Sequence, residues 1–181
     1  MAMRRLHAPL LLAVLLLSAL VAAHAQYSGL NALKRIEAAL TRKKMTTTVT
    51  YMRECGFNDT LVVRLPESTT TLLLPMNTGW NKLSAYTRNL LRKDPKKMWQ
   101  VFAYHMIAGR YMYKQLTRIP YNKLLVTGYE SFKVRRFPTK LPQFGKPGTH
   151  GGAYVKVNNV YQDVHVAIHG VNNVMIPEFT D

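Results

Sequence analysis

Cysteine is almost absent from this chain. Cys55 is the single cysteine among 181 residues, so no disulfide can form within the molecule and a hydrophobic core must hold the fold. Cys55 lies just before Gly56, at the end of a helix-like segment, and we expect it to be a buried, inert thiol. The alternative is a disulfide between two molecules.

Long apolar runs are also lacking, except near the N-terminus. The run Leu10–Ala23 is shorter than the roughly 20 residues that a membrane-spanning helix needs. Arg4 and Arg5 precede it, and small residues follow it up to Ala25. This pattern is typical of a secretory signal peptide, with cleavage between Ala25 and Gln26. A retained signal anchor is the alternative.

The remaining chain predicts one secreted domain. We expect residues 1–25 to be the signal peptide and residues 26–181 to form a single domain large enough for a real core. The C-terminal residues lack the apolar tail of a lipid-anchor signal. We therefore expect an extracellular protein without a stable membrane anchor, and the oligomeric state stays open.

Acidic residues are scarce. The chain has 25 Lys and Arg but 9 Asp and Glu, and without residues 1–25 it keeps 23 basic and 9 acidic residues, a net charge of +14. Such an excess favours polyanionic partners. In a secreted protein, acidic polysaccharide is a more natural partner than nucleic acid; the alternative is that the charges only promote solubility. The basic clusters are Arg42–Lys44, Arg92-Lys93, Lys96-Lys97, and Lys133 with Arg135-Arg136.

Catalytic and metal-binding motifs are missing. There is no Gly-x-Ser-x-Gly, His-Glu-x-x-His or phosphate loop. His165 and His169 have the spacing of two ligands on a helix, but their flanks are typical of a strand, and Asp163 is the only acid nearby. We expect no catalytic residue, no metal site and no cofactor, and therefore not an enzyme.

The periodicity of apolar residues changes along the chain. Helical spacing predicts helices over Leu30–Leu40, over Val49–Cys55, from Asn77 as N-cap through Leu91, and from the N-cap Asp94 with Pro95 at the first position. Alternating or β-branched residues predict strands at Thr69–Leu74, Leu124–Val126, Tyr129–Val134, Tyr154–Val157, Val160–Val166 and Val171–Ile176. We expect a tight hairpin at Asn158-Asn159 and a loop over Phe137–Gly152. Helices followed by strands favour an α+β domain.

Three segments carry a resemblance to a known family. They are 70–80 (TTLLLPMNTGW), 102–111 (FAYHMIAGRY) and 164–177 (VHVAIHGVNNVMIP). In this order and spacing they are similar to the signatures of the fasciclin domain, a secreted adhesion module. The resemblance covers roughly Leu30–Phe179 and implies an α/β wedge, with N-terminal helices packed on an antiparallel, sandwich-like sheet.

The chain also departs from the family. Met76–Gly79 stands where small and acidic residues are usual, and Asn172-Asn173 stands where His or Asp is common. The core pattern is therefore kept better than any polar site. The chain looks most like plant fasciclin-like proteins without their arabinogalactan stretches, which would place it in the apoplast or cell wall.

The resemblance implies an adhesion role for Tyr104 and His105. In animal relatives the Tyr-His segment has been linked to receptor-mediated adhesion. However, a histidine at a helix end beside Phe102 and Met106 is more often packed and hydrogen-bonded. We favour the structural interpretation of His105 and keep the pair as a tentative adhesion motif.

One glycosylation acceptor is present. Asn58-Asp59-Thr60 is the only Asn-x-Ser/Thr sequence in the chain, and a secreted chain meets the glycosylation machinery. We expect an N-glycan on Asn58, in a loop after Gly56; an unused acceptor is the alternative.

Three functions remain in view. The first is a secreted adhesion or matrix module whose basic surface contacts acidic cell-wall or matrix polysaccharide. The second is a protein-recognition module in which the Tyr104-His105 region meets a cell-surface receptor. The third, a secreted hydrolase without recognisable motifs, is the least favoured.

Overall fold

The computed structural model describes residues 7–65, 68–128, 133–139, 141–145 and 152–179. In these ranges the helices are α1 His7–Arg42, α2 Thr46–Glu54, α3 Phe57–Arg64, α4 Asn77–Asn81, α5 Ala85–Lys93, α6 Pro95–Tyr104 and α7 Tyr113–Arg118. The strands are β1 Thr70–Pro75, β2 Met106–Ala108, β3 Leu124–Val126, β4 Lys133–Arg136, β5 Gln143–Gly145, β6 Ala153–Gln162 and β7 Val166–Val171. The predicted α+β class is confirmed.

The strands form one mixed sheet in the order β2-β1-β7-β6-β5-β4-β3. Its neighbouring strands are antiparallel except β1 and β7, which run parallel from Thr70↔Val166 to Pro75↔Val171. A bridge between Ile107 and Thr127 brings the two edges of the sheet together. The sheet is therefore nearly closed, and the expected all-antiparallel arrangement is wrong for the β1·β7 pair.

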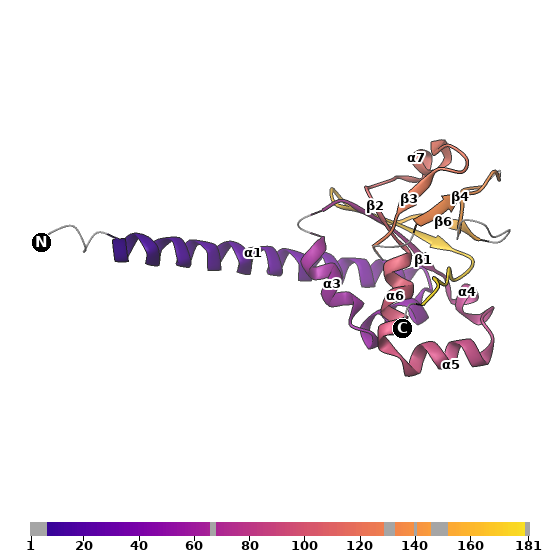
Figure 1. Ribbon diagram of the computed structural model, residues 1–181, viewed down its shortest axis with the longest axis horizontal. Coiled ribbons are helices and arrows are strands. Elements are labelled where there is room, and N and C mark those ends of the chain that lie inside the picture. Colours follow the sequence, from indigo (N-terminus) through magenta and orange to yellow (C-terminus); the bar gives the residue numbers. More distant parts are fainter. Residues whose placement is uncertain (1–6, 66–67, 129–132, 140, 146–151, 180–181) are drawn as a thin grey trace, which may run out of the picture.

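Two hydrophobic clusters lie on opposite sides of the sheet. The helical cluster joins α1–α6 to β1 and β7, with Trp80 and Phe102 at its centre. The second cluster fills the curve of the sheet and includes Tyr104, Phe144 and Val155. Figure 1 shows the helices α3–α6 gathered at one end and α7 with β3 and β4 at the other.

Helix α1 has two unlike parts. Its first part carries exposed apolar side chains from Leu11 to Val21 and projects away from the rest of the protein (Figure 1). Burial begins at Gly29, which packs so closely on α3 that a Cβ would collide with the Val62 carbonyl. Leu30 is 43% exposed, whereas Leu33, Ile36 and Leu40 of the predicted helical stripe are buried. By length and hydropathy Leu11–Arg42 could cross a membrane, a test that signal sequences also pass.

Of the two helix N-caps predicted from the sequence, Asp94 is confirmed and Asn77 is not. Asp94 caps α6 as predicted, since its Oδ1 accepts from Lys97 N at 3.0 Å and Pro95 begins the helix. Asn77 does not cap a helix running to Leu91. Its Oδ1 instead accepts from Thr47 N at 3.0 Å, which satisfies the first turn of α2. A short α4 ends at Asn81 before α5 begins.

The strand predictions needed three corrections. Strand β6 continues through Asn158-Asn159, where Asn159 has a φ of 45°; the register shifts there, so these residues form an irregularity and not a hairpin. The last strand is Val166–Val171, and no strand covers residues 172–176. The expected loop Phe137–Gly152 contains β5. The predicted pairing of Leu124–Val126 with the following strand is confirmed at Val126↔Lys133, and residues 129–132 lie outside the described ranges.

Candidate functional site

Tyr104 and His105 stand at the end of α6, where the chain turns into β2. The helix places both side chains inward: Tyr104 is 1% exposed and His105 is fully buried. Neither can touch a partner in this conformation. The structural interpretation of His105 is thus supported, and an adhesive role for the region stays a prediction about the exposed residues around it.

His105 holds together segments that are distant in the sequence. Its Nδ1 lies 2.8 Å from Val101 O, and its Nε2 lies 3.0 Å from Met175 N. A carbonyl can only accept and an amide can only donate, so the ring is neutral with its proton on Nδ1. Burial lowers the pKa of His105 to about 4. The imidazole therefore acts as a fixed structural strut rather than as a proton-transfer group.

Tyr104 is equally unsuited to chemistry. Its hydroxyl donates to the Lys133 carbonyl at 3.5 Å within the second hydrophobic cluster. Burial, with a smaller contribution from the charge of Glu178, raises the pKa of Tyr104 to about 12. The phenol stays protonated at any physiological pH.

His169 is a second buried histidine with the opposite tautomer. Its Nε2 donates to Tyr111 O at 2.9 Å, and its Nδ1 accepts from Asn159 N at 3.1 Å. Burial lowers the pKa of His169. His165 lies at the surface turn before β7, so the two histidines do not share a site. Among the described residues no group of three His, Cys, Asp or Glu could hold a metal ion.

Cys55 and Asn58 lie where α2 passes into α3. Cys55 is half-buried rather than fully buried, and burial raises the pKa of its thiol to about 11, which keeps the reactive thiolate scarce. Asn58 lies in α3, so the predicted loop position is wrong. Its Nδ2 donates to Glu37 Oε1 at 2.8 Å.

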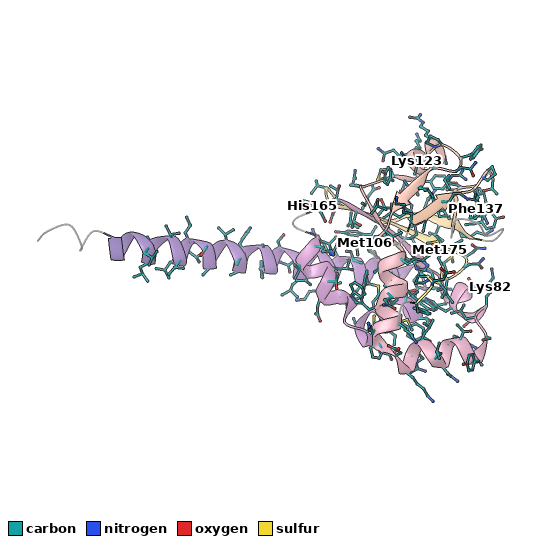
Figure 2. All side chains as sticks on the ribbon, viewed as in Figure 1. Lys82, Met106, Lys123, Phe137, His165 and Met175 are labelled. Atoms are coloured by element: carbon teal, nitrogen blue, oxygen red, sulfur yellow. The ribbon has the colours of Figure 1, made fainter. Side chains whose placement is uncertain are left out.

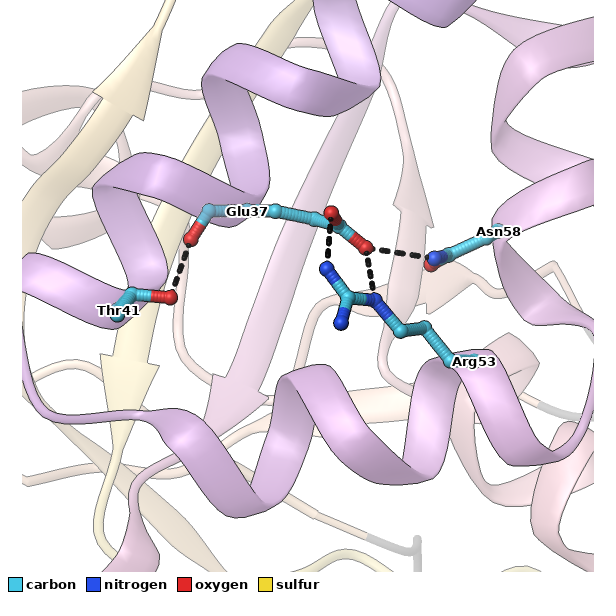
Figure 3. A network of polar contacts seen from close by, with 4 residues as sticks. All are labelled: Glu37, Thr41, Arg53 and Asn58. Carbon is cyan, nitrogen blue, oxygen red and sulfur yellow. Dashed lines mark hydrogen bonds and ion pairs between the residues drawn. The ribbon is translucent and has the colours of Figure 1, made fainter.

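Glu37 connects three helices through this contact. Its carboxylate accepts from Arg53 Nε at 2.8 Å and from an Arg53 terminal nitrogen at 2.6 Å, while its carbonyl accepts from Thr41 (Figure 3). The Arg53 hydrogen bonds are the main reason that the pKa of Glu37 is lowered. The network ties α1 to α2 and α3.

The basic clusters do not converge on one face. Those on α5 and α6 lie at the helical end and are partly offset by acids: Arg92 lies 3.9 Å from Glu54, and Lys97 lies 3.8 Å from Asp94. The other group lies on α7, immediately before β3 and on β4 at the opposite end, where Figure 2 labels Lys123. We call the exposed residues Lys114, Arg118, Lys123 and Lys133 the basic sheet end.

The basic sheet end has almost no acidic neighbour in the sequence. Residues 95–162 contain twelve basic residues and one acid, Glu130, which lies outside the described residues. The side chains of Tyr121, in the turn before β3, and of Leu124 and Val126, on β3, are exposed there. Arg135 stacks 4.9 Å from the centre of the Phe137 ring. The surface therefore combines cations with apolar contact area.

Arg136 belongs to the interior and not to this surface. It is 1% exposed, its guanidinium stacks 5.2 Å from the centre of the Tyr121 ring, and its terminal nitrogens donate to the carbonyls of Phe137 and Thr139. Burial lowers the pKa of Arg136. The predicted Arg135-Arg136 cluster is thus split between an interior strut and a surface cation.

A pocket of about 690 Å³ opens between α1 and the turn from β6 to β7. Its polar lining is Ser28, Arg35, Arg110, Gln162, Asp163 and His165. This pocket could not be predicted from the sequence, because Arg35 in α1 and Arg110 after β2 are far apart in the chain and no spacing rule connects them. The label of His165 in Figure 2 marks the side of the protein on which it lies.

Helices packed on a mixed, nearly closed sheet define an α+β domain whose Tyr-His segment serves the core. The Fasciclin domain model matches residues 43–177, and the chain belongs to the fasciclin domain family. The match starts after α1. The plant-type subgroup expected from the sequence stays a prediction.

Solved structures give a further comparison. Twenty-one solved chains match. One is the structure titled "Novel Fold Revealed by the Structure of a FAS1 Domain Pair from the Insect Cell Adhesion Molecule Fasciclin I". It is similar over 85% of this chain, with 19% identity and a TM-score of 0.48, and this chain spans 48% of its length. No curated protein is found to match the sequence.

Proposed function

We propose that the protein is a secreted, non-enzymatic adhesion or matrix module that binds acidic polysaccharide through the basic sheet end. The fasciclin domain supports an adhesion-type module. The observation that carries the choice of ligand is the acid-poor stretch 95–162. Within it, the basic sheet end gathers exposed cations on α7, immediately before β3 and on β4. A polyanionic chain binds such a surface by charge, while Tyr121 and Leu124 supply contact area for sugar rings.

The two parts of α1 support secretion with cleavage between Ala25 and Gln26. The apolar side chains from Leu11 to Val21 are exposed to solvent, as expected for a segment that the folded domain does not need. Packing on the domain begins at Gly29, so Gln26–Arg42 remains as the first helix of the mature chain. In a plant, the destination would be the apoplast or cell wall.

Salt and charge variants test the polysaccharide proposal. We expect the secreted protein to bind polygalacturonate at low ionic strength, and to bind it much less at high ionic strength, because exposed charges are screened. Neutral galactan should not bind. The double variant Lys114→Gln/Lys123→Gln should weaken binding several-fold, while the matched control Lys93→Gln/Lys96→Gln at the helical end should not.

Two outcomes would contradict the proposal. Absence of polygalacturonate binding at low salt would remove it. Equal loss in both double variants would show that only net charge matters, without a defined surface. Binding of a protein receptor that survives high salt would instead favour the second function, in which exposed residues around the buried Tyr104-His105 pair form a packed interface.

A further inference from the structure

The pocket between α1 and the β6–β7 turn is a second candidate binding site, separate from the basic sheet end. We propose that it binds a sugar acid, a polyhydroxylated ligand whose carboxylate is held by Arg110 and Arg35. Its volume of about 690 Å³ falls in the range of small-molecule sites. The proposal does not depend on polysaccharide binding at the basic sheet end, which lies on other elements.

Arg110 carries the argument because the described residues leave one nitrogen of its guanidinium unpaired. Its Nε is buried and has no hydrogen-bond partner among the described residues. A buried donor without an acceptor is costly, and such groups are rare without a functional reason. A planar guanidinium matches a carboxylate in a bidentate geometry. Arg110 therefore has the unused capacity that an anionic ligand would take up.

The backbone around Arg110 is held in place. The buried Thr71 hydroxyl donates to Gly109 O at 2.7 Å and accepts from Tyr111 N at 2.8 Å, so it fixes the residues on both sides of Arg110. His169 also donates to Tyr111 O at 2.9 Å. Gly109 itself has a φ of 91°, a conformation that favours glycine. The arginine is thus presented from a rigid segment, which lowers the entropic cost of binding.

Asp163 does not compete for the arginines by hydrogen bonding. Its Oδ1 accepts from the backbone amides of His165 and Val166 at 2.9 Å each, and its Oδ2 accepts from Tyr161 at 2.9 Å. The carboxylate shapes the turn rather than neutralising Arg110. Its negative charge still lies in the lining, so Arg35 and Arg110 leave a net excess of one positive charge, suited to a single carboxylate.

The rest of the lining suits the body of a sugar. Ser28, Gln162 and His165 provide groups that can exchange hydrogen bonds with ligand hydroxyls. Ala32 and Leu65 add apolar surface, and Val164 at the turn is 78% exposed. C–H faces of a pyranose could pack on these side chains. A simple inorganic anion would leave most of this lining unused.

Calorimetric titration of the protein purified from a secreting host tests the proposal, with galacturonate, galactose and sulfate as probes. We expect galacturonate to bind, and galactose to bind at least about tenfold more weakly, because it lacks the charge-assisted hydrogen bonds of the carboxylate. Sulfate should also bind more weakly, because it leaves the lining that would contact the sugar unused. Arg110→Gln and Arg35→Gln should each weaken galacturonate binding by about tenfold. Arg92→Gln, which removes an exposed charge from α5, should leave it unchanged.

Arg35 is exposed on α1, so its variant keeps the test valid even where Arg110→Gln perturbs folding. Unaltered galacturonate binding in Arg35→Gln and in a folded Arg110→Gln would overturn the proposal. Galactose binding as tight as galacturonate binding would show that the carboxylate is not recognised. Sulfate binding as tight as galacturonate binding would show that the sugar ring is not recognised. Absence of galacturonate binding would overturn it outright, whatever the result with polygalacturonate.

Discussion

His105 and Met175 are joined by a hydrogen bond of 3.0 Å from the Met175 amide to His105 Nε2. The contact fastens the segment after β7 to the end of α6, across 70 residues of sequence. The same ring donates to Val101 O, and the His105 carbonyl accepts from Leu73 N in β1. One residue thus connects a helix, a strand and the C-terminal segment.

Replacing His105 with alanine should destabilise the protein. The change leaves the buried Met175 N–H without its acceptor and opens a cavity, so we expect the free energy of unfolding to fall by about 2–4 kcal/mol. Urea unfolding measures this loss. His105→Gln, which can restore an acceptor near Nε2, should lose less. A wild-type unfolding midpoint in His105→Ala would contradict the role of the strut.

The buried histidines also predict a pH dependence of stability. Above pH 6.5 His105 is neutral in both states and its contribution is fully present. As the pH falls from 6.5 towards 4, the unfolded chain takes up a proton that the folded ring, with its pKa of about 4, refuses. Stability should decrease by about 3 kcal/mol over this window and stop decreasing from this cause below it. His169 acts in the same direction.

Urea unfolding at several pH values measures this loss, and NMR titration assigns it. The His105 ring signals should stay unchanged down to about pH 5. Titration near pH 6.5 would show that the ring is solvated and would contradict its burial. Glu37 and Asp163, whose pKa values are lowered, contribute stability that the protein loses at lower pH, as the pH falls from the ordinary carboxylate pKa through their lowered folded-state values.

The Glu37–Arg53 pair should contribute modestly to stability. Arg53 is 61% exposed and Glu37 17%, so solvent weakens an otherwise well-aligned bidentate contact. Arg53→Gln should lower the free energy of unfolding by about 1 kcal/mol, less at high salt. Arg92→Gln is the matched control: its contact with Glu54 is 3.9 Å long and exposed, and its loss should be barely measurable. Equal effects would count against the network in Figure 3.

Mass spectrometry before and after glycosidase treatment tests the glycan on Asn58. We expect the secreted protein to lose mass on treatment, and Asn58→Gln to show no such loss. Because Asn58 lies in α3 with its Nδ2 on Glu37, attachment must precede folding of this helix. Thr60→Ser keeps both the acceptor sequence and a hydroxyl for Trp99 Nε1, so it should retain the glycan. If the secreted wild-type chain has the mass of the unmodified sequence, the prediction of a glycan on Asn58 is wrong.

The sequence predicted correctly those features that depend on residues close together in the chain. Asp94 and Pro95 supply an N-cap and a fixed φ within four residues, and α6 begins there. The apolar stretch before Pro75 forms the buried β1. The predicted N-cap role of Asn77 was wrong because its side-chain oxygen accepts instead from Thr47 N in the first turn of α2. That turn is close to Asn77 only in the folded chain.

Features that depend on distant partners could not be predicted. Asn159 resembles a turn residue, yet its amide bonds to His169 Nδ1 and the strand continues past it. The pocket requires α1, the segment after β2 and the β6–β7 turn to meet, and nothing in the spacing of Arg35 and Arg110 indicates that meeting. The structural interpretation of His105, in contrast, followed from its place at a helix end beside Phe102 and Met106, whereas the burial of Tyr104 was not predicted.

The parallel pair β1·β7 constrains how the protein can be made. Thr70 pairs with Val166, so the central strands of the sheet are separated by almost the whole domain. Contacts of such long sequence separation slow folding, because a large loop must close before they form. The nascent chain therefore cannot complete its sheet until residue 171 has been synthesised, and until then β1 is unpaired on the side that β7 covers in the folded protein.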